Sequence, residues 1–265
     1  LPVIHDINFM HRQRDLPFLK SIYFRKQFRK FAKKASRIAT VSEYSKNDLI
    51  NTWQLDPSKI DVVYNGVSEK FFPQKNTFDN NSPGKPYFLF VGNLSPRKNI
   101  PNLIRAYNKF RDRVEEEYRL VIAGERFFMN GEVDRLITNS DYKDEIILTG
   151  KKSPDELRLL YSNAIALVFV PWFEGFGIPL LEAMKCACPV ICSDTTSMPE
   201  IAGDAAILVK PDSPEMIAEE MYRLISNPGI RESRIEIGYR QAEQFSWDNT
   251  ASDLWNSVLK SLNIN

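Results

Sequence analysis

Short apolar runs alternate with helix-forming segments through residues 87–245, and this alternation constrains the fold more than any other feature of the chain. A continuous run of apolar and β-branched residues predicts a strand that is buried on both faces of a parallel sheet. Strands that alternate with helices in this way are typical of a doubly wound α/β domain. The expected strands lie near 87–91, 119–123, 146–150, 165–170, 188–192 and 206–209, and the expected helices near 100–113, 131–140, 153–163, 178–185, 213–227 and 246–262.

The loop after the run 165–170 carries Glu174, Gly175 and Gly177, and Glu182 follows in the next expected helix. In an open α/β sheet, ligands bind at the carboxyl ends of the strands, where glycines let the backbone turn sharply and approach a ligand. A helix that begins after Gly177 directs amides at an anion and stabilises a phosphate by up to ~2 kcal/mol. Glu182 can accept hydrogen bonds from a vicinal diol such as a ribose. The alternative interpretation is that both glutamates are ordinary surface acids.

Two cations, Arg97 and Lys98, lie between the expected strand 87–91 and the expected helix near 100–113. Asn99 is expected to cap that helix with its side chain. Because parallel strands end at the same edge of a sheet, the two cations are expected near the Gly-x-Gly turn. The alternative is a solvated charged loop.

The spacing from Glu174 to Glu182 resembles the E-x(7)-E motif of retaining glycosyltransferases of family 4, which have the two-lobed GT-B fold. The segment 91–99 is similar to the donor-phosphate loop of that family, and 182–184 and 189–191 are similar to the stretch after its motif. The resemblance implies an α/β protein of GT-B type. It would combine a doubly wound, Rossmann-like C-terminal domain that binds a nucleotide-sugar donor with an N-terminal Rossmann-like lobe that binds the acceptor.

The resemblance also implies roles for particular residues. Glu174 would contact hydroxyls of the donor sugar, Glu182 would hold the ribose, and Lys151 would border the nucleotide base. Arg97 and Lys98 would neutralise the diphosphate. The residues implied in donor binding are Asn93, which stands where many relatives carry Arg, with Arg97, Lys98, Lys151, Glu174, Gly175, Phe176, Gly177, Ile178, Leu181 and Glu182, and those implied in catalysis are His5, Glu174 and Lys98.

The part before residue 66 shows three strand candidates, at 2–5, 38–41 and 60–63. This is little secondary structure for a lobe of ~150 residues. We therefore expect residues 1–75 to form the C-terminal portion of an acceptor-binding lobe whose earlier portion is missing. A linker at 76–86, a donor domain at 87–245 and a helix at 246–265 that crosses back to the first lobe would follow.

His5 matches the histidine that lies at the bottom of the cleft in the family, near the donor sugar and the acceptor hydroxyl. The alternative is a structural histidine at a strand end.

Residues 18–37 are expected to form a basic amphipathic helix, which can lie on an anionic membrane surface. Its alternative is a packed helix with a solvated basic face. A net charge of +1 leaves no broad basic footprint for nucleic acid.

Composition sets outer limits on the chain. Its 265 residues hold mixed charge and no apolar stretch near the ~20 residues of a membrane span, as in a soluble globular protein. Cys186, Cys188 and Cys192 lack the spacing and the His partners of a zinc site, so we expect reduced core thiols. The expected location is the cytoplasm, or the inner face of the membrane if 18–37 binds lipid.

The implied activity is transfer of a hexose, with retention, from a nucleoside diphosphate sugar to a saccharide or lipid-linked saccharide. The segment Ser95–Asn99 is similar to mannosyltransferases that use GDP-mannose, and the sequence leaves GDP-sugar and UDP-sugar open. No Asp-x-Asp metal motif is present, so neither a metal nor a cofactor is expected. Two alternatives remain: a non-catalytic sugar-nucleotide-binding subunit of a split transferase, and a nucleotide-sugar epimerase of the same fold.

Overall fold

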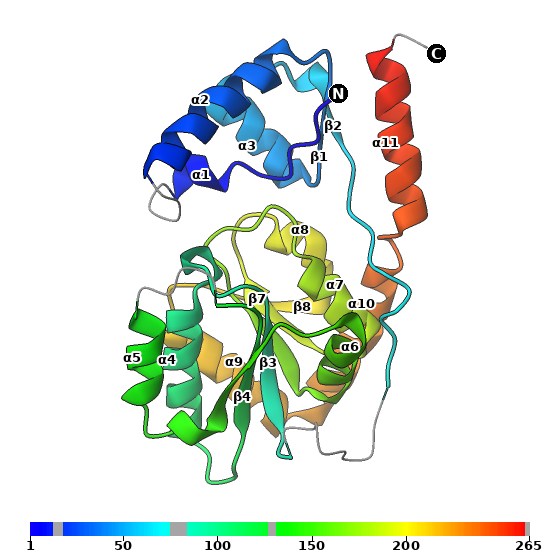
Figure 1. Cartoon of the computed structure of the whole chain (residues 1–265). Coiled ribbons are helices and arrows are strands. Elements are labelled where there is room, and N and C mark those ends of the chain that lie inside the picture. The colour runs from blue at the N-terminus through cyan, green and yellow to red at the C-terminus, as the bar shows by residue number, and fades with distance from the viewer. Residues whose placement is uncertain (13–17, 75–83, 127–130, 263–265) are drawn as a thin grey trace.

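The computed structural model describes residues 1–12, 18–74, 84–126 and 131–262, which form two parts joined by extended segments (Figure 1). The larger part contains a six-stranded sheet with the order β5-β4-β3-β6-β7-β8, and every neighbouring pair is parallel. The expected α/β class and the six expected strands are confirmed. The strands are β3 (Tyr87–Val91), β4 (Arg119–Ala123), β5 (Ile146–Gly150), β6 (Ala166–Phe169), β7 (Val190–Ser193) and β8 (Ala206–Val209).

Helices cover both faces of this sheet (Figure 1). A strand followed by a helix and a parallel strand needs a crossover, and crossovers to both sides bury both faces, so β3 is buried along its whole length. One layer consists of α4 (Ile100–Arg111), α5 (Glu132–Thr138) and α9 (Pro214–Ser226), and the other of α6 (Pro154–Asn163), α7 (Ile178–Lys185) and α10 (Pro228–Ala242). A short helix, α8 (Met198–Ala202), follows β7.

The strand order reverses direction between β3 and β6. From β3 the chain adds β4 and β5 on one side, and then returns to place β6, β7 and β8 on the other. The loops that leave β3 and β6 therefore meet at this point, where the N–H of Trp172 donates to the carbonyl of Arg97. Such a switch point is where open α/β sheets bind ligands. Residues 92–99 and 170–177 border it.

The smaller part packs three helices around a two-stranded parallel sheet. Its elements are α1 (Asn8–His11), α2 (Phe18–Lys34), β1 (Ile38–Thr40), α3 (Glu43–Trp53) and β2 (Ile60–Val62). The strand expected at 2–5 is reduced to a single bridge between Val3 and Ala39. An apolar core built on Ile7, Leu49 and Trp53 holds these elements together.

Helix α11 (Trp247–Ser261) lies beside the smaller part (Figure 1). Lys260 Nζ lies 3.3 Å from Asp61 Oδ1, and Thr250 Oγ1 donates to the carbonyl of Tyr64 at 2.7 Å. A β-carbon at Gly66 would lie 2.3 Å from the main-chain nitrogen of Trp247, so only glycine lets the two segments pass. Most of the expected linker 76–86 lies outside the described residues.

The three cysteines are free and buried, as predicted. Burial raises the pKa of the Cys186 and Cys188 thiols to about 12, so they remain protonated at neutral pH and act as core side chains. In the described ranges, no helix is both long enough and apolar enough to cross a membrane.

Candidate functional site

A buried ion cluster lies at the switch point. Arg97 Nη1 lies 2.6 Å from Glu174 Oε2, and Lys98 Nζ lies 2.5 Å from the same oxygen. The Lys98 side chain is only 7% exposed, and its ammonium lies 4.6 Å from the Phe169 ring centroid. The carbonyl of Arg97 also accepts the N–H of Trp172 at 2.8 Å, which ties the two loops together. Charges from two distant loops thus meet because β3 and β6 are neighbours.

The cluster favours the ionised form of Glu174. Burial alone would raise the pKa of Glu174, but the positive charges of Lys98 and Arg97 and their hydrogen bonds outweigh it and lower that pKa. Lys98 shares a single carboxylate oxygen with Arg97, and burial lowers the Lys98 pKa. An ammonium has three N–H donors, so Lys98 can donate to a further acceptor besides Glu174.

A cavity of about 260 Å³ adjoins the cluster, between the two parts of the molecule. A β-carbon at Gly175 would lie 2.7 Å from Asp6 Cβ, so glycine is required for this approach. Ser42 Oγ donates to the carbonyl of Gly175 at 2.7 Å and fixes the turn. The cavity is lined by His5, Asp6, Val41, Asn65, Glu174, Gly175, Phe176, Gly177, Ile178 and Pro179.

The N-terminus of α7 opens onto the same cavity. Its N-cap, Gly177, has a φ of 106°, and no side chain caps the helix. A β-carbon there would lie 2.6 Å from Met198 Cε. Within the described residues, no hydrogen bond uses the amides of Phe176, Gly177 or Ile178. Uncapped amides at a helix N-terminus suit an anion. The geometry therefore provides an anion site beside Lys98.

Six of the residues implied in donor binding lie outside the lining of this cavity: Arg97 and Lys98, which form the ion cluster beside it, and Asn93, Lys151, Leu181 and Glu182. Glu182 accepts a hydrogen bond from the Tyr161 hydroxyl at 2.9 Å, and burial raises the pKa of Glu182. Leu181 is fully buried in the core. Asn93 is exposed and accepts from Ser95 Oγ at 3.0 Å. Lys151 is 78% exposed, with its ammonium 3.8 Å from Glu125.

His5 lines the cavity from the smaller part, and its carbonyl accepts a hydrogen bond from Ser45 Oγ at 3.0 Å. Its neighbour Asp6 was not among the predicted site residues, although Asp6 also lines the cavity. Burial raises the pKa of Asp6, and Asp6 Oδ1 accepts the N–H of Asn8 at 3.0 Å. An acid next to a histidine at a strand end was the available signal for it.

The prediction that the Asn99 side chain caps α4 is wrong. Asn99 stands at the N-cap position, but its Nδ2 donates to the carbonyls of Val170 and Pro211 at 2.9 and 2.7 Å. Its φ of 59° is left-handed, whereas a residue that caps a helix with its side chain is typically extended. Asn99 instead ties the loop after β3 to the ends of β6 and β8. Among the described residues, no group of three His, Cys, Asp or Glu side chains is placed to hold a metal.

Comparison with known proteins identifies relatives over both parts. Residues 72–241 match the family of glycosyl transferases group 1, and residues 2–71 match Glycosyltransferase Family 4. O-antigen chain mannosyltransferase B of Escherichia coli is 28% identical over 96% of this chain and 68% of its own length. O-antigen chain mannosyltransferase RfbU of Salmonella typhimurium is 34% identical over 79% of this chain.

The chain spans 56% of RfbU, so it is shorter than these relatives. Sucrose-phosphate synthase from Thermosynechococcus elongatus superposes with a TM-score of 0.80, over 98% of this chain and 67% of that one, at 17% identity. This likeness concerns the fold alone and confirms the GT-B type. Because the first family match covers more than half of the chain, the chain belongs to the glycosyl transferases group 1.

Proposed function

We propose that this chain binds a nucleoside diphosphate sugar and transfers its hexose, with retention and without a metal, to a saccharide or lipid-linked saccharide. The observation that carries the proposal is the placement of Lys98 and Arg97 beside the uncapped amides of α7. Together they offer positive charge and N–H donors to one diphosphate.

The proposed transfer requires stabilisation of the negative charge that develops on the departing diphosphate. Preorganised donors in a buried site stabilise developing negative charge because they need no reorganisation during the reaction. In this proposal Lys98, Arg97 and the amides of Phe176 and Gly177 hold the diphosphate. Glu174 orients the hydroxyls of the sugar, and the acceptor hydroxyl attacks from the face that the diphosphate leaves. His5 borders this position from the other side of the cavity.

The proposed donor sugar is mannose, carried by GDP. Two relatives that align with this chain are named mannosyltransferases. The test is incubation of the chain with GDP-mannose and a methyl α-mannoside acceptor in EDTA, with the product anomer read by NMR. An α-linked product formed at an undiminished rate in EDTA is expected. An inverted product, or transfer that stops in EDTA, would contradict retention or metal independence.

The same experiment separates the alternatives. Epimerised donor that forms without acceptor would identify an epimerase. Nucleotide binding without any transfer would identify a binding subunit.

Glu182→Gln is expected to weaken binding of GDP by roughly tenfold, because hydrogen bonds to a charged carboxylate are worth about 1.5–3 kcal/mol. Isothermal titration calorimetry measures this. Glu236→Gln, at an exposed position on α10, is the matched control and should bind GDP as the parent does. Equal affinities of the parent and Glu182→Gln would remove the ribose contact from the proposal.

The pH dependence follows from the raised Glu182 pKa. The ionised carboxylate accepts hydrogen bonds from the diol more strongly than the neutral carboxyl group, so GDP affinity should fall as pH drops through a window above 4.5, the ordinary value for glutamate. Glu182→Gln should lack this loss. The Tyr161 hydroxyl lowers the Glu182 pKa, so Tyr161→Phe should move the window upward.

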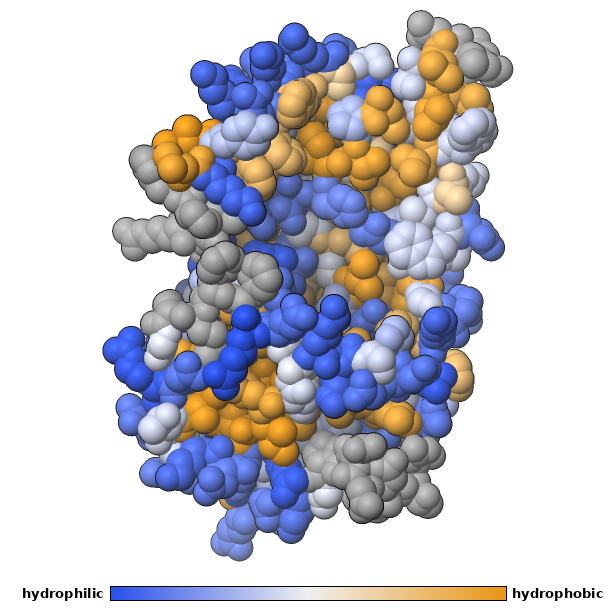
Figure 2. Space-filling model, viewed as in Figure 1, coloured by the Kyte–Doolittle hydropathy of each residue, from blue (hydrophilic) through white to orange (hydrophobic). Residues whose placement is uncertain are grey.

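We also propose that α2 contacts an anionic membrane. Phe24, Phe28 and Ala32 pack into the core of the smaller part, while Leu19, Ile22, Tyr23 and Phe31 are exposed. Exposed Lys and Arg side chains accompany them, and Figure 2 shows hydrophilic residues over the upper edge of this part. An exposed apolar row among cations suits a lipid surface.

Substitution of Lys26, Lys30 and Lys33 by Gln should weaken binding to phosphatidylserine vesicles by roughly a hundredfold, at about 1 kcal/mol for each lysine. Vesicle co-sedimentation at several salt concentrations measures this. The matched control replaces the exposed Lys109, Lys143 and Lys210 of the larger part. Equal loss in both triple variants would indicate attraction by net charge and contradict a specific role for α2.

A further inference from the structure

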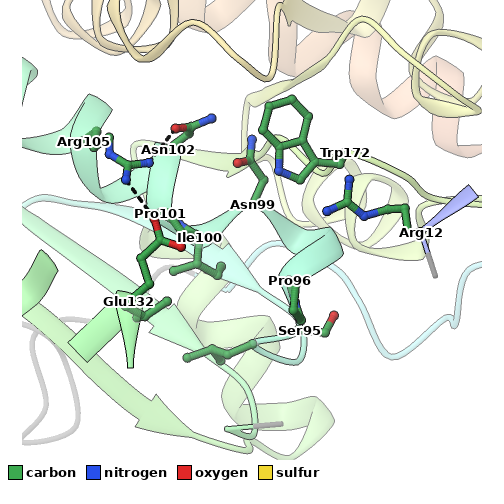
Figure 3. A pocket seen from close by; sticks show the side chains of 12 residues that line it. Arg12, Ser95, Pro96, Asn99, Ile100, Pro101, Asn102, Arg105, Glu132 and Trp172 are labelled. Atoms are coloured by element: carbon green, nitrogen blue, oxygen red, sulfur yellow. Dashed lines mark hydrogen bonds and ion pairs between the residues drawn. The ribbon is translucent and has the colours of Figure 1, made fainter. Parts of the chain in front are cut away.

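A second cavity, of about 250 Å³, opens beside the turn at Pro96–Lys98 (Figure 3). It shares no lining residue with the cavity at the α7 N-terminus. Trp172 and Arg12 border one side, and Asn102 and Arg105 the other, with Glu132 beside Arg105 (Figure 3). Arg12 comes from the smaller part, so this cavity also lies where the two parts meet.

Three successive residues of the loop after β6 have side chains in three different surroundings. The Trp172 ring borders this cavity, the Phe173 ring lies 5.5 Å from His11 and 5.8 Å from Tyr44, and Glu174 binds Arg97 and Lys98. Trp172 belongs to neither apolar core of the described residues. A half-buried indole with no core to fill is placed to contact a ligand.

The polar groups of the cavity suit a neutral ligand rich in hydroxyls. Arg105 donates to Asn102 Oδ1 and Glu132 Oε1, each at 2.9 Å, and a guanidinium has more N–H donors than these two bonds use. Because Glu132 balances the charge of Arg105, this ion pair does not favour an anionic ligand over a neutral one. Arg12 Cζ lies 6.0 Å from the Trp172 ring centroid, at the outer limit of a cation–π contact. An aromatic face with donors and acceptors around it matches a pyranose.

The position of this cavity suits the binding of an acceptor saccharide. Trp172 and Glu174 are two residues apart, so their Cα atoms lie within about 7 Å of each other. A saccharide on Trp172 could therefore extend its next hydroxyl towards the sugar held at Glu174.

The geometry points to a binding subsite for a neutral pyranoside of the acceptor, with Trp172 as its stacking platform and Arg105 and Glu132 as hydroxyl partners. This inference rests on the proposed transfer reaction for its role. The binding of the saccharide does not depend on that reaction and can be measured alone.

The experiment is saturation-transfer NMR of the chain with methyl α-mannopyranoside, methyl α-glucopyranoside and methyl α-galactopyranoside, in the presence of GDP. At least one glycoside should bind, and Trp172→Ala should raise its Kd about tenfold or more, as for an aromatic anchor in a pocket. Trp172→Phe keeps an aromatic face and should retain most of the affinity. Trp255→Ala, at a 61% exposed position on α11, is the matched control and should not change it.

Calorimetry with GDP separates this subsite from the donor site. Trp172→Ala should bind GDP with unchanged affinity. Parallel loss of GDP and glycoside would place Trp172 in the donor site and overturn the inference. Unchanged glycoside affinity in Trp172→Ala, or no glycoside binding to the parent chain, would also overturn it. Failure of GDP and UDP to bind the parent would instead remove the proposed function and leave glycoside binding at Trp172 standing.

Discussion

Lys98→Met is expected to lower kcat for glycosyl transfer by about a thousandfold, the scale of loss when one preorganised donor leaves a buried site. The Lys98 ammonium is nearly inaccessible to solvent and lies 2.5 Å from Glu174, beside the cavity proposed for the donor. Water cannot easily replace a charge in such a position. Steady-state kinetics with GDP-mannose measure the effect.

The matched control for Lys98 is Lys109→Met, at an exposed position on α4, which should retain the parent kcat. Lys98→Arg should restore little activity, because a planar guanidinium does not fit the enclosed space of an ammonium. A loss confined to KM in Lys98→Met would mean that Lys98 holds the donor equally in ground state and transition state. That result would contradict stabilisation of the leaving group.

Glu174→Gln is expected to lower kcat by about a hundredfold or more while GDP affinity is kept or increased. The amide keeps the shape of the carboxylate but no longer attracts Lys98 and Arg97, so both cations become more available to the diphosphate. Sugar orientation would suffer, because a carboxylate accepts from two hydroxyls where an amide oxygen accepts less. Kinetics and calorimetry on the same preparation measure both quantities.

Glu182→Gln is expected to change GDP affinity in the opposite direction from Glu174→Gln and to bind GDP more weakly. If Glu174→Gln lost GDP affinity as strongly as Glu182→Gln, Glu174 would be a nucleotide ligand rather than a sugar ligand.

The pH dependence of the free energy of unfolding gives a second test of Glu174. The Glu174 pKa is lowered in the folded chain, so its contribution to stability is present above pH 4.5 and is lost as pH falls below that value. Urea unfolding of Glu174→Gln should lack this part of the acid dependence.

Local patterns were sufficient to predict the sheet of the larger part. The runs at 87–91, 119–123, 146–150 and 206–209 coincide with β3, β4, β5 and β8. The reason is that a strand inside a parallel sheet is buried on both faces, so it is apolar at nearly every position, as β3 and β4 are, and a single sequence displays such a run directly. The sequence pattern does not predict the helix α10, because Pro228 indicates the end of α9. Asn227 caps α10 through Ile230 N–H, and Pro228 occupies its first turn.

The residue types of the candidate site also came from the sequence, since a Gly-x-Gly turn and a pair of cations at strand ends are local features. The residues that these groups contact could not be predicted from the sequence. Glu174 meets Lys98 only because the strand order places β6 beside β3, and the Glu182 hydrogen bond to Tyr161 depends on the packing of α6 against α7. The second cavity needs Arg12, Trp172 and Arg105 from three separate segments.

The sequence by itself determined which segments are strands and helices and which loops carry charge, because burial and backbone propensity act between near neighbours in the chain. Only the tertiary structure decided which face of α2 is exposed, which charges pair and where Trp172 lies. Those outcomes depend on sheet order and on contact between the two parts, and both join residues that are far apart in sequence.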